Sequence, residues 1–228
     1  ISEFYALHVS PEYAPGVIAT RPGTLFAGSS SVEVEFTGVP GHAGLPHRAV
    51  DPIVAVASFV MQVQTMVSRN VDPAAGGVAL TFGTIGGGTV VNGVAASAKV
   101  TGTLRFTGDR QHALSFRRIR EIAAGTAMAT GTSVDTRLED TPWVPVVNDP
   151  EISGRFIGYL RNRPGVTFAD APVTMTSEDY GYLISRIPGM MFWLGTGGAH
   201  SLHSDRFAPD ETVIEPAVRL VADYLTRL

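Results

Sequence analysis

The sequence predicts an α/β layer structure into which a smaller α+β unit of the ferredoxin-like class is inserted. Residues from about 29 to 140 show the order β-α-β-β-α-β, which is that of the split βαβ unit with two helices on one face of an antiparallel sheet. The flanking runs "EFYALHV" and "GMMFWLG" are almost continuously apolar, as is typical of strands buried on both faces. We therefore expect an α/β piece over 1–28, the inserted unit over 29–140, and a second α/β piece over 141–228.

Each element of the inserted unit has its own pattern. In "SVEVEFT", residues 31–37, apolar and acidic residues alternate, which predicts a strand with one wet face. Pro52 stands at a plausible first helical position, and apolar residues recur every three or four positions, which predicts a helix over about 51–69. The remaining expected elements are the strands "VALTFGTIGGG" and "SAKVTGTLRFTG", the helix "RQHALSFRRIREIAAGTAMAT" and the strand "SVDTRLE".

The second flank carries three further helical patterns, at about 149–163, 177–186 and 212–227. Pro22-Gly23 and Thr141-Pro142 are turn-forming pairs of the kind found where a chain passes between domains. The α/β part has only one strand before the inserted unit and a few elements after it, which is little for an α/β domain. We therefore expect the chain to be part of a longer protein.

Composition excludes several classes of function. The 228 residues are 44% hydrophobic and 17% charged, a globular balance, and the formal charge of −4 without a basic run argues against nucleic acid or an anionic membrane as partner. No run of about 18 apolar residues occurs, and the first residues lack a signal-peptide pattern. The absence of cysteine excludes disulfides and thiolate metal sites within this sequence. Cytoplasm is the default location.

Among the six histidines, His8 and His203 stand where chemistry is expected. His8 ends one buried-type strand, and His203 lies in the loop "GTGGAHSLHSDRF" after another; ligands of α/β sheets collect at the carboxyl ends of strands. Neutral imidazole suits zinc, manganese or cobalt, but two imidazoles alone do not make a hydrolytic metal site. Taken singly, each histidine is more often structural than a ligand.

Two glycine-rich segments allow competing interpretations. "GHAGLPH" places His42 and His47 on a loop that is also a plain turn with two solvent-exposed histidines. "TIGGGTVVNG" lacks the Lys-Ser/Thr pair and the following helix of a phosphate-binding loop, so hairpin geometry explains Gly86–Gly88 better.

Arg105 and Glu178 are also open to two readings. An arginine on the apolar strand "TGTLRFT" either pairs internally or binds a ligand carboxylate, and Asn92 lies at the turn before that strand. Glu178 and Asp179 are adjacent, which excludes a two-carboxylate dyad; with Ser177 they could simply cap a helix.

Several motifs, taken in order, resemble the amidohydrolase subfamily of the aminoacylase/carboxypeptidase metallopeptidases, which includes hippurate hydrolases and indole-acetyl-amino-acid hydrolases. The resemblance covers essentially the whole chain and corresponds to the C-terminal part of that family. The motifs are "ALHV", "GVIATRPG", "GVPGHAGLPH", "DPI", "QTMVSR", "GTLRF", "SEDYGYL", "PGMMFWLGTG" and "LHSDRF".

The resemblance implies roles for individual residues. His8 and His203 match ligands of two divalent metal ions (Zn, Mn, Co or Ni), and the histidine rather than aspartate at position 8 favours the amidohydrolase branch. His42 matches the catalytic histidine that hydrogen-bonds the oxyanion, in several members across a dimer. Asn92, Arg105 and Glu178 match substrate-binding positions, the arginine binding a carboxylate. The inserted unit matches a lid and dimerisation domain.

The implied activity is metal-dependent hydrolysis of the amide bond of small N-acyl amino acids by a homodimer joined through the lid. "NGVAAS" departs from the family pattern after Asn92, and the family's first half, with the remaining metal ligands and the general base, has no counterpart here. We therefore expect the chain by itself to be inactive. Two alternatives remain: a non-catalytic dimerisation or binding module, and a metallo-carboxypeptidase acting on peptides.

Overall fold

The computed structural model describes residues 1–140 and 143–228, which divide into two compact units. Unit 1 comprises Ile1–Phe26, Pro145–Thr174 and Glu178–Leu228; unit 2 comprises Ala27–Val144 and Met175–Ser177. The expected passage at Thr141-Pro142 lies outside the described residues.

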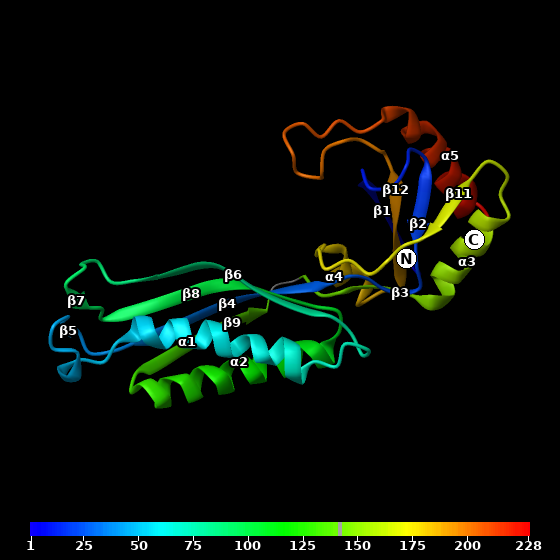
Figure 1. Cartoon of the computed structure of the whole chain (residues 1–228). Helices are drawn as coiled ribbons and strands as arrows, with labels where there is room; N and C mark the ends of the chain where they lie inside the picture. Colours follow the sequence, from blue (N-terminus) through cyan, green and yellow to red (C-terminus); the bar gives the residue numbers. More distant parts are fainter. Residues whose placement is uncertain (141–142) are drawn as a thin grey trace. The chain divides into compact units, whose positions relative to one another are not determined.

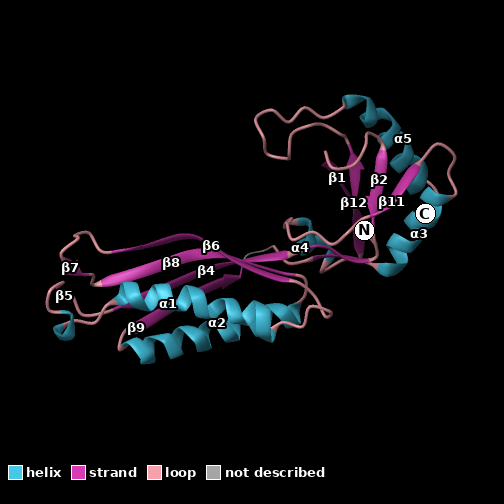
Figure 2. Ribbon diagram, in the orientation of Figure 1, coloured by secondary structure: helices cyan, strands magenta, loops and turns pink. Residues whose placement is uncertain are grey.

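Unit 2 is a four-stranded antiparallel sheet covered on one face by two helices (Figures 1 and 2). The strand order β6-β8-β4-β9 and the chain order β4-α1-β6-β8-α2-β9 follow the expected β-α-β-β-α-β succession. Its elements are β4 (Gly28–Thr37), β5 (Gly41–His42), a 3-10 turn (Pro46–Arg48), α1 (Pro52–Thr65), a π-helical turn (Met66–Asn70), β6 (Val78–Gly87), β7 (Gly93–Val94), β8 (Ser97–Phe106), α2 (Asp109–Thr130) and β9 (Ser133–Asp140).

The alternation of apolar and acidic residues in β4 gives this strand one buried and one wet face, as predicted. Val32, Val34 and Phe36 are buried against the helices, and the Phe36 ring lies 5.8 Å from that of Phe59 on α1. On the opposite face, Glu33 receives hydrogen bonds from cationic side chains of β8 and β9. One face of the sheet is therefore wet, and the other forms the core of the unit.

The helix ends are set by local chemistry. The Asp51 carboxylate accepts a hydrogen bond from the backbone N–H of Ile53 at 2.9 Å, and Pro52 takes the first helical position, so α1 begins where the sequence predicted. Its α-helical part ends at Thr65, short of the predicted 69, because the last residues form a π-helical turn. α2 ends at Gly131, whose φ of 73° is left-handed.

Unit 1 contains a four-stranded mixed sheet of order β1-β12-β2-β11 and a short antiparallel pair, β3 with β10. Helices α3 and α5 pack on one face of the sheet, where Phe156 and Leu220 share a core with Phe192. Its elements are β1 (Phe4–Ser10), β2 (Val17–Thr20), β3 (Gly23–Phe26), β10 (Val146–Asn148), α3 (Pro150–Arg161), β11 (Thr167–Asp170), α4 (Tyr180–Ile184), β12 (Gly189–Gly195), a 3-10 turn (Glu211–Val213) and α5 (Ile214–Leu225).

The two apolar flanking strands differ in burial. In β12, Met190 and Phe192 enter one core cluster and Met191 enters the other, so this strand is buried on both faces as predicted. Within the described residues, β1 is the last strand of the sheet, is mostly half-buried and leaves Leu7 40% exposed, so this chain does not show the predicted burial of both its faces. An edge strand has a neighbour on one side only, which an apolar run does not reveal.

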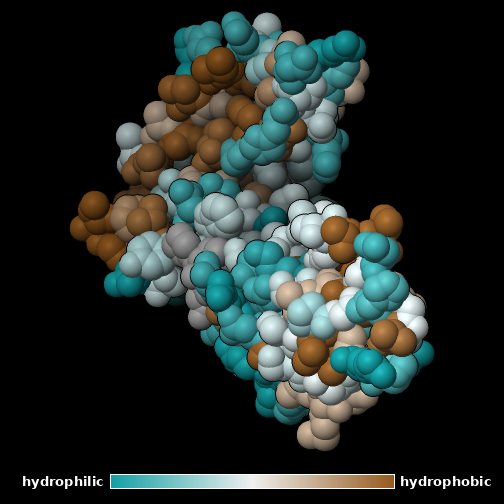
Figure 3. Space-filling view, turned by 90° about the vertical axis from the view of Figure 1, so that its left-hand side faces the viewer, coloured by the Kyte–Doolittle hydropathy of each residue, from teal (hydrophilic) through white to brown (hydrophobic). Residues whose placement is uncertain are grey.

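The outer side of unit 1 presents apolar surface. An apolar groove of about 490 Å³ lies between β1 and α5, and its walls include Leu7, Val9, Val218 and Val221. Figure 3 shows a continuous brown region on this unit. No helix within residues 1–140 and 143–228 is both long and apolar enough to cross a membrane.

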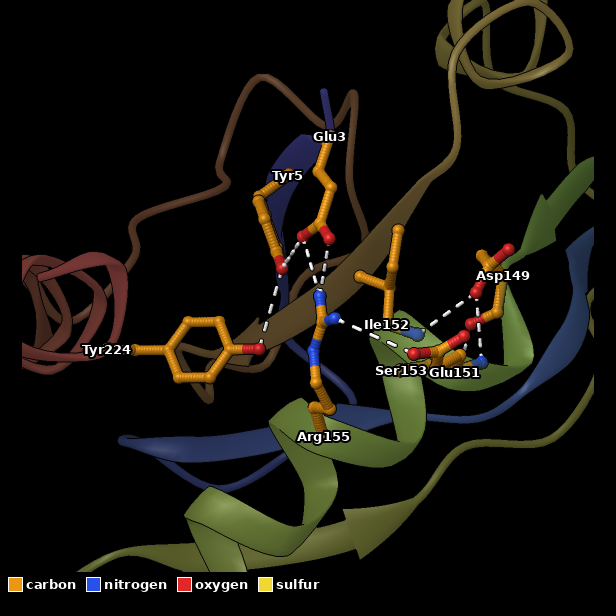
Figure 4. Close-up of polar contacts among 8 residues, drawn as sticks. All are labelled: Glu3, Tyr5, Asp149, Glu151, Ile152, Ser153, Arg155 and Tyr224. Carbon is orange, nitrogen blue, oxygen red and sulfur yellow. Dashed lines mark hydrogen bonds and ion pairs between the residues drawn. The ribbon is translucent and has the colours of Figure 1, made fainter. Parts of the chain in front are cut away.

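A polar cluster ties β1 to α3 and α5 (Figure 4). Arg155 on α3 donates to both carboxylate oxygens of Glu3, at 2.6 and 2.7 Å, and the Tyr5 hydroxyl donates to Glu3 at 2.6 Å. Tyr224 on α5 lies 3.4 Å from the Tyr5 hydroxyl. Burial and the hydrogen bond to Glu3 raise the pKa of Tyr5 above its usual value, so the phenol stays protonated.

A second cluster joins α5 to the end of α3. Asp223 accepts hydrogen bonds from Arg227, Tyr159 and Arg163. The hydrogen bonds from Arg227 and Tyr159 lower the pKa of Asp223 to about 2. The carboxylate therefore stays charged at any pH at which the protein is ordinarily handled.

This cluster predicts a pH dependence for unit 1. The folded-state pKa lies below the value of about 3.9 for a free aspartate, so the stabilisation is present above pH 4 and is lost as the pH falls toward 2. We expect Asp223→Asn to lower the Tm at neutral pH, and the difference from the unsubstituted chain to shrink between about pH 4 and 2. Thermal unfolding at several pH values measures this, with exposed Glu12→Gln as control. An equal difference at all these values would contradict it.

Candidate functional site

His8 lies near the end of β1, in parallel register with Trp193 of β12, and the two rings are 5.2 Å apart. Its Nδ1 lies 2.8 Å from the carbonyl oxygen of Val9. A carbonyl only accepts, so Nδ1 carries the proton and Nε2 keeps its lone pair. This is the tautomer that a metal-ligating histidine adopts when a backbone carbonyl holds its other nitrogen. The ring therefore fits the ligand role.

Glu178 stands just before α4, and its carboxylate accepts the backbone N–H of Tyr180 at 2.6 Å. Of the residues expected to cap this helix, only Glu178 contacts its first turn, because the N-cap residue Asp179 makes no side-chain capping hydrogen bond. Burial, with a further contribution from the neighbouring Asp179, raises the pKa of Glu178 above its usual value, although the hydrogen bond from Tyr180 and the nearby His8 act in the opposite direction. The structure therefore brings Glu178 into electrostatic range of His8.

His203 lies in the exposed loop between β12 and the Glu211–Val213 turn. Its φ is 66°, a left-handed conformation that residues with a side chain seldom adopt. Within residues 1–140 and 143–228, no three histidine, aspartate or glutamate side chains come together in a way that could hold a metal ion. His8, Glu178 and His203 therefore do not form such a group.

His42 and Asn92 lie side by side at one end of unit 2. His42 of β5 pairs with Gly93 of β7, and the Ala43 N–H donates to the carbonyl of Asn92 at 3.1 Å. The Gly44 N–H donates to His42 Nδ1 at 3.0 Å. Nδ1 is therefore the acceptor, and the proton of the neutral ring sits on Nε2. The loop thus presents an exposed N–H donor with a fixed tautomer.

Arg105 lies near the opposite end of unit 2, where β8 pairs with Ser29 of β4 and Ala79 of β6. It is half-buried, and its guanidinium donates to the hydroxyl of Ser177. The sequence reading of Ser177 as part of a helix cap missed this contact, because the two residues are far apart in the chain. The only sequence signal for a contact of Ser177 was its position in the "SED" motif, next to Glu178.

The length of the strands keeps these two groups apart within one chain. In β8, Ser97 and Arg105 are eight residue steps apart, a rise of about 27 Å. His42 and Asn92 lie beyond the Ser97 end, and Figure 1 shows β5 and β7 at one end of the long strands. The structure therefore brings His42 to Asn92, but not to Arg105 of the same unit.

Comparison with known proteins gives this arrangement a context. Residues 26–128, most of unit 2, match the model of the peptidase dimerisation domain of the M20 family. The chain is 44% identical over 226 residues to the N-acetyldiaminopimelate deacetylase of Enterococcus faecalis, covering 99% of this chain and 60% of that protein. The chain therefore carries an M20 peptidase dimerisation domain. It is also 42% identical over 223 residues to the protein of the same name from Streptococcus suis, covering 98% of this chain and 59% of that one.

Solved structures share this fold. A protein of methicillin-resistant Staphylococcus aureus has a TM-score of 0.89 at 24% identity, covering 97% of this chain and 58% of the other. A dinuclear metal-binding peptidase of the M20 family from Bacillus subtilis has a TM-score of 0.80 at 22% identity, covering 97% and 56%. The chain spans about 60% of the length of the curated relatives it matches.

The two histidines should hold opposite tautomers. In metal-free protein at a pH where both rings are neutral, we expect the proton on Nδ1 in His8 and on Nε2 in His42, because a carbonyl faces one ring and an N–H faces the other. Imidazole ¹⁵N chemical shifts, assigned with His8→Gln and His42→Gln variants, measure this. The same tautomer in both rings would contradict the geometry.

Proposed function

We propose that this chain serves metal-dependent hydrolysis of the amide bond of N-acyl amino acids. The observation that carries the proposal is its 44% identity, over almost its whole length, to a protein named N-acetyldiaminopimelate deacetylase. Deacetylation is amide hydrolysis. The relative's name describes a substrate in which a small acyl group is attached to the nitrogen of an amino acid. A free carboxylate near the scissile amide is therefore the substrate feature for this chain to recognise.

His8 and His203 would each hold one of two divalent cations, with Zn, Mn, Co and Ni as candidates. The tautomer of His8, with Nε2 free, supports its part of this assignment. Bound divalent cations supply Lewis acidity to the amide carbonyl and lower the pKa of water. Glu178, within electrostatic range of His8, would line the same site.

His42 would stabilise the oxyanion that forms on the amide carbonyl. Its Nε2–H is a donor, and the Gly44 N–H together with the β5–β7 pairing holds the loop in place before substrate arrives. Asn92 lies beside it and would contact the substrate near the carbonyl. A donor held in advance needs no reorganisation during the reaction, which is the source of its effect on rate.

Arg105 would bind the substrate carboxylate through its planar guanidinium. Its hydrogen bond to the Ser177 hydroxyl would orient the guanidinium. The clamp would act on binding and orientation rather than on the chemical step.

Unit 2 would act as the ferredoxin-like lid and dimerisation domain, within proposed boundaries of 1–28, 29–140 and 141–228. The strand order β6-β8-β4-β9 with both helices on one face supports the ferredoxin-like class. The family match of residues 26–128 supports the dimerisation role.

That same match favours a second candidate function. The 228-residue chain could serve as a dimerisation or binding module without activity of its own, because the matched region is described by its role in dimerisation. A metallo-carboxypeptidase acting on peptides differs from the main proposal only in substrate.

Hydrolysis by the 228-residue chain and by the longest natural form of the protein tests the proposal. We expect the longest form, loaded with Zn or Mn, to cleave N-acetyl amino acids faster than dipeptides and to lose activity with a chelator. In that form, His42→Ala should lower kcat roughly 100- to 1,000-fold, the effect of removing one oxyanion donor. His47→Ala, in the same exposed loop, is the matched control and should stay near the unsubstituted rate.

Three outcomes would count against these assignments. A kcat within a few-fold for His42→Ala would overturn the oxyanion role. Faster cleavage of dipeptides would favour the carboxypeptidase. No hydrolysis by either form, with normal folding and metal uptake, would favour the binding module.

A further inference from the structure

The sequence contains a single Asn-Gly pair, Asn92-Gly93. In such a pair the backbone nitrogen of the glycine can attack the amide carbon of the asparagine side chain, because glycine has no side chain to hinder ring closure. In a folded protein this reaction depends on the exposure of the asparagine, on the hydrogen bonds of its side chain, and on the freedom of the following nitrogen. The structure fixes all of these at Asn92.

Asn92 is exposed in the turn that leads into β7, at one end of the long strands (Figure 1). Within residues 1–140 and 143–228, its side chain makes no hydrogen bond. The three other asparagines are held in place. Asn148 is hydrogen-bonded through both its oxygen and its nitrogen, Asn70 through its oxygen and Asn162 through its nitrogen. Asn92 is therefore the asparagine whose amide turns most freely toward the next residue.

The backbone nitrogen of Gly93 is also free to react. The Ala43 N–H donates to the carbonyl of Asn92, which makes these two residues a hydrogen-bonded pair of the antiparallel β5–β7 ladder. Hydrogen-bonded and non-hydrogen-bonded pairs alternate along such a ladder, so the next pair, His42 with Gly93, is of the non-hydrogen-bonded type. The N–H of Gly93 therefore points away from β5, and it has no acceptor among the described residues.

We propose that Asn92-Gly93 is a site of spontaneous modification, at which the side-chain amide is converted to a carboxylate. The deprotonated nitrogen of Gly93 attacks Cγ of Asn92 and forms a new C–N bond, which closes a succinimide ring. The bond from Cγ to Nδ2 breaks, and this nitrogen takes a proton from water and leaves as ammonia. Water then adds to either ring carbonyl and opens the ring, which leaves aspartate or isoaspartate at position 92. Water is the only co-reactant, so the inference does not depend on the proposed hydrolysis.

The two products differ in their effect on the loop that carries His42. Aspartate keeps the backbone and adds one negative charge. Isoaspartate also routes the backbone through Cβ and Cγ, which lengthens it by one atom between residues 92 and 93. That is the point at which Ala43 and His42 pair with β7. Isoaspartate therefore disturbs the β5–β7 pairing that holds this loop.

Timed incubation of the folded 228-residue chain at neutral and mildly alkaline pH tests the site. Trypsin releases residues 70–99 as one peptide, which carries both Asn70 and Asn92. We expect its mass to rise by the difference between an acid and an amide, with fragmentation placing the change at position 92. The converted fraction should increase with time and with pH, because the attacking nitrogen must lose its proton. Asn70, also exposed but hydrogen-bonded and followed by valine, is the internal control and should keep its amide.

Two variants separate ring closure at this pair from other chemistry. Gly93→Ala should slow the conversion, because the added methyl group hinders the attack. A Cβ there lies 3.0 Å from Val90, whose side chain is 62% exposed and able to shift. Asn92→Gln should not convert, because its longer side chain would have to close a larger ring. Circular dichroism shows that both variants are folded.

An unchanged amide at position 92 after incubation at alkaline pH would overturn the proposal. Equal conversion of Asn70 and Asn92, or an unchanged rate in the folded Gly93→Ala chain, would do the same.

The imidazole ¹⁵N chemical shifts of fresh and incubated chains test the effect on the loop. Those of His42 should change with the converted fraction, while those of His8 in unit 1 stay the same. Incubated Asn92→Gln should match its fresh form. Conversion to isoaspartate without any change at His42 would contradict the expected effect on the β5–β7 pairing. Neither measurement needs metal or substrate, so both are independent of whether the proposed hydrolysis is found.

Discussion

The length of the β4–β8 ladder is the constraint on which the rest of this molecule depends. Ten consecutive residue pairs, from Gly28 with Phe106 to Thr37 with Ser97, make unit 2 a long, stiff sheet. The sheet is held by one core, in which Phe36, Phe59 and Phe82 touch across strand and helix. Groups placed at its two ends cannot meet within one copy. Under the proposed roles, a single unit 2 would therefore offer a small substrate either His42 or Arg105, but not both.

Local backbone contacts fix His8 and His42 in opposite tautomers, which suit different chemical roles. A carbonyl oxygen holds one nitrogen of His8 and leaves a lone pair outward, while an amide N–H holds His42 and leaves a donor outward. The same side chain is thus made a candidate ligand in unit 1 and a candidate donor in unit 2 by a single neighbouring backbone group. Neither arrangement needs a charged partner, so both can be set before metal or substrate binds.

The sequence predicts most of the elements, because period and capping are local. "GMMFWLG" is β12 without a residue added or lost, and the alternation in β4 predicted its wet and buried faces. The edge position of β1 and the contact of Arg105 with Ser177 were not predictable, because each depends on which distant segments become neighbours. The tautomers of His8 and His42 depend on single backbone groups whose directions no residue pattern encodes.

Under the proposed roles, His42 and Arg105 would serve one substrate from two different copies, and subunit mixing tests this most directly. His42→Ala and Arg105→Ala forms of the longest natural protein, the first impaired in kcat and the second in substrate binding, are dissociated, mixed in equal amounts and reassociated, and activity is measured at a substrate concentration well below KM. The account predicts that about a quarter of the unsubstituted activity returns, because half of the dimers are mixed and each of these has one intact site. Mixtures that form mixed dimers but stay inactive would contradict it.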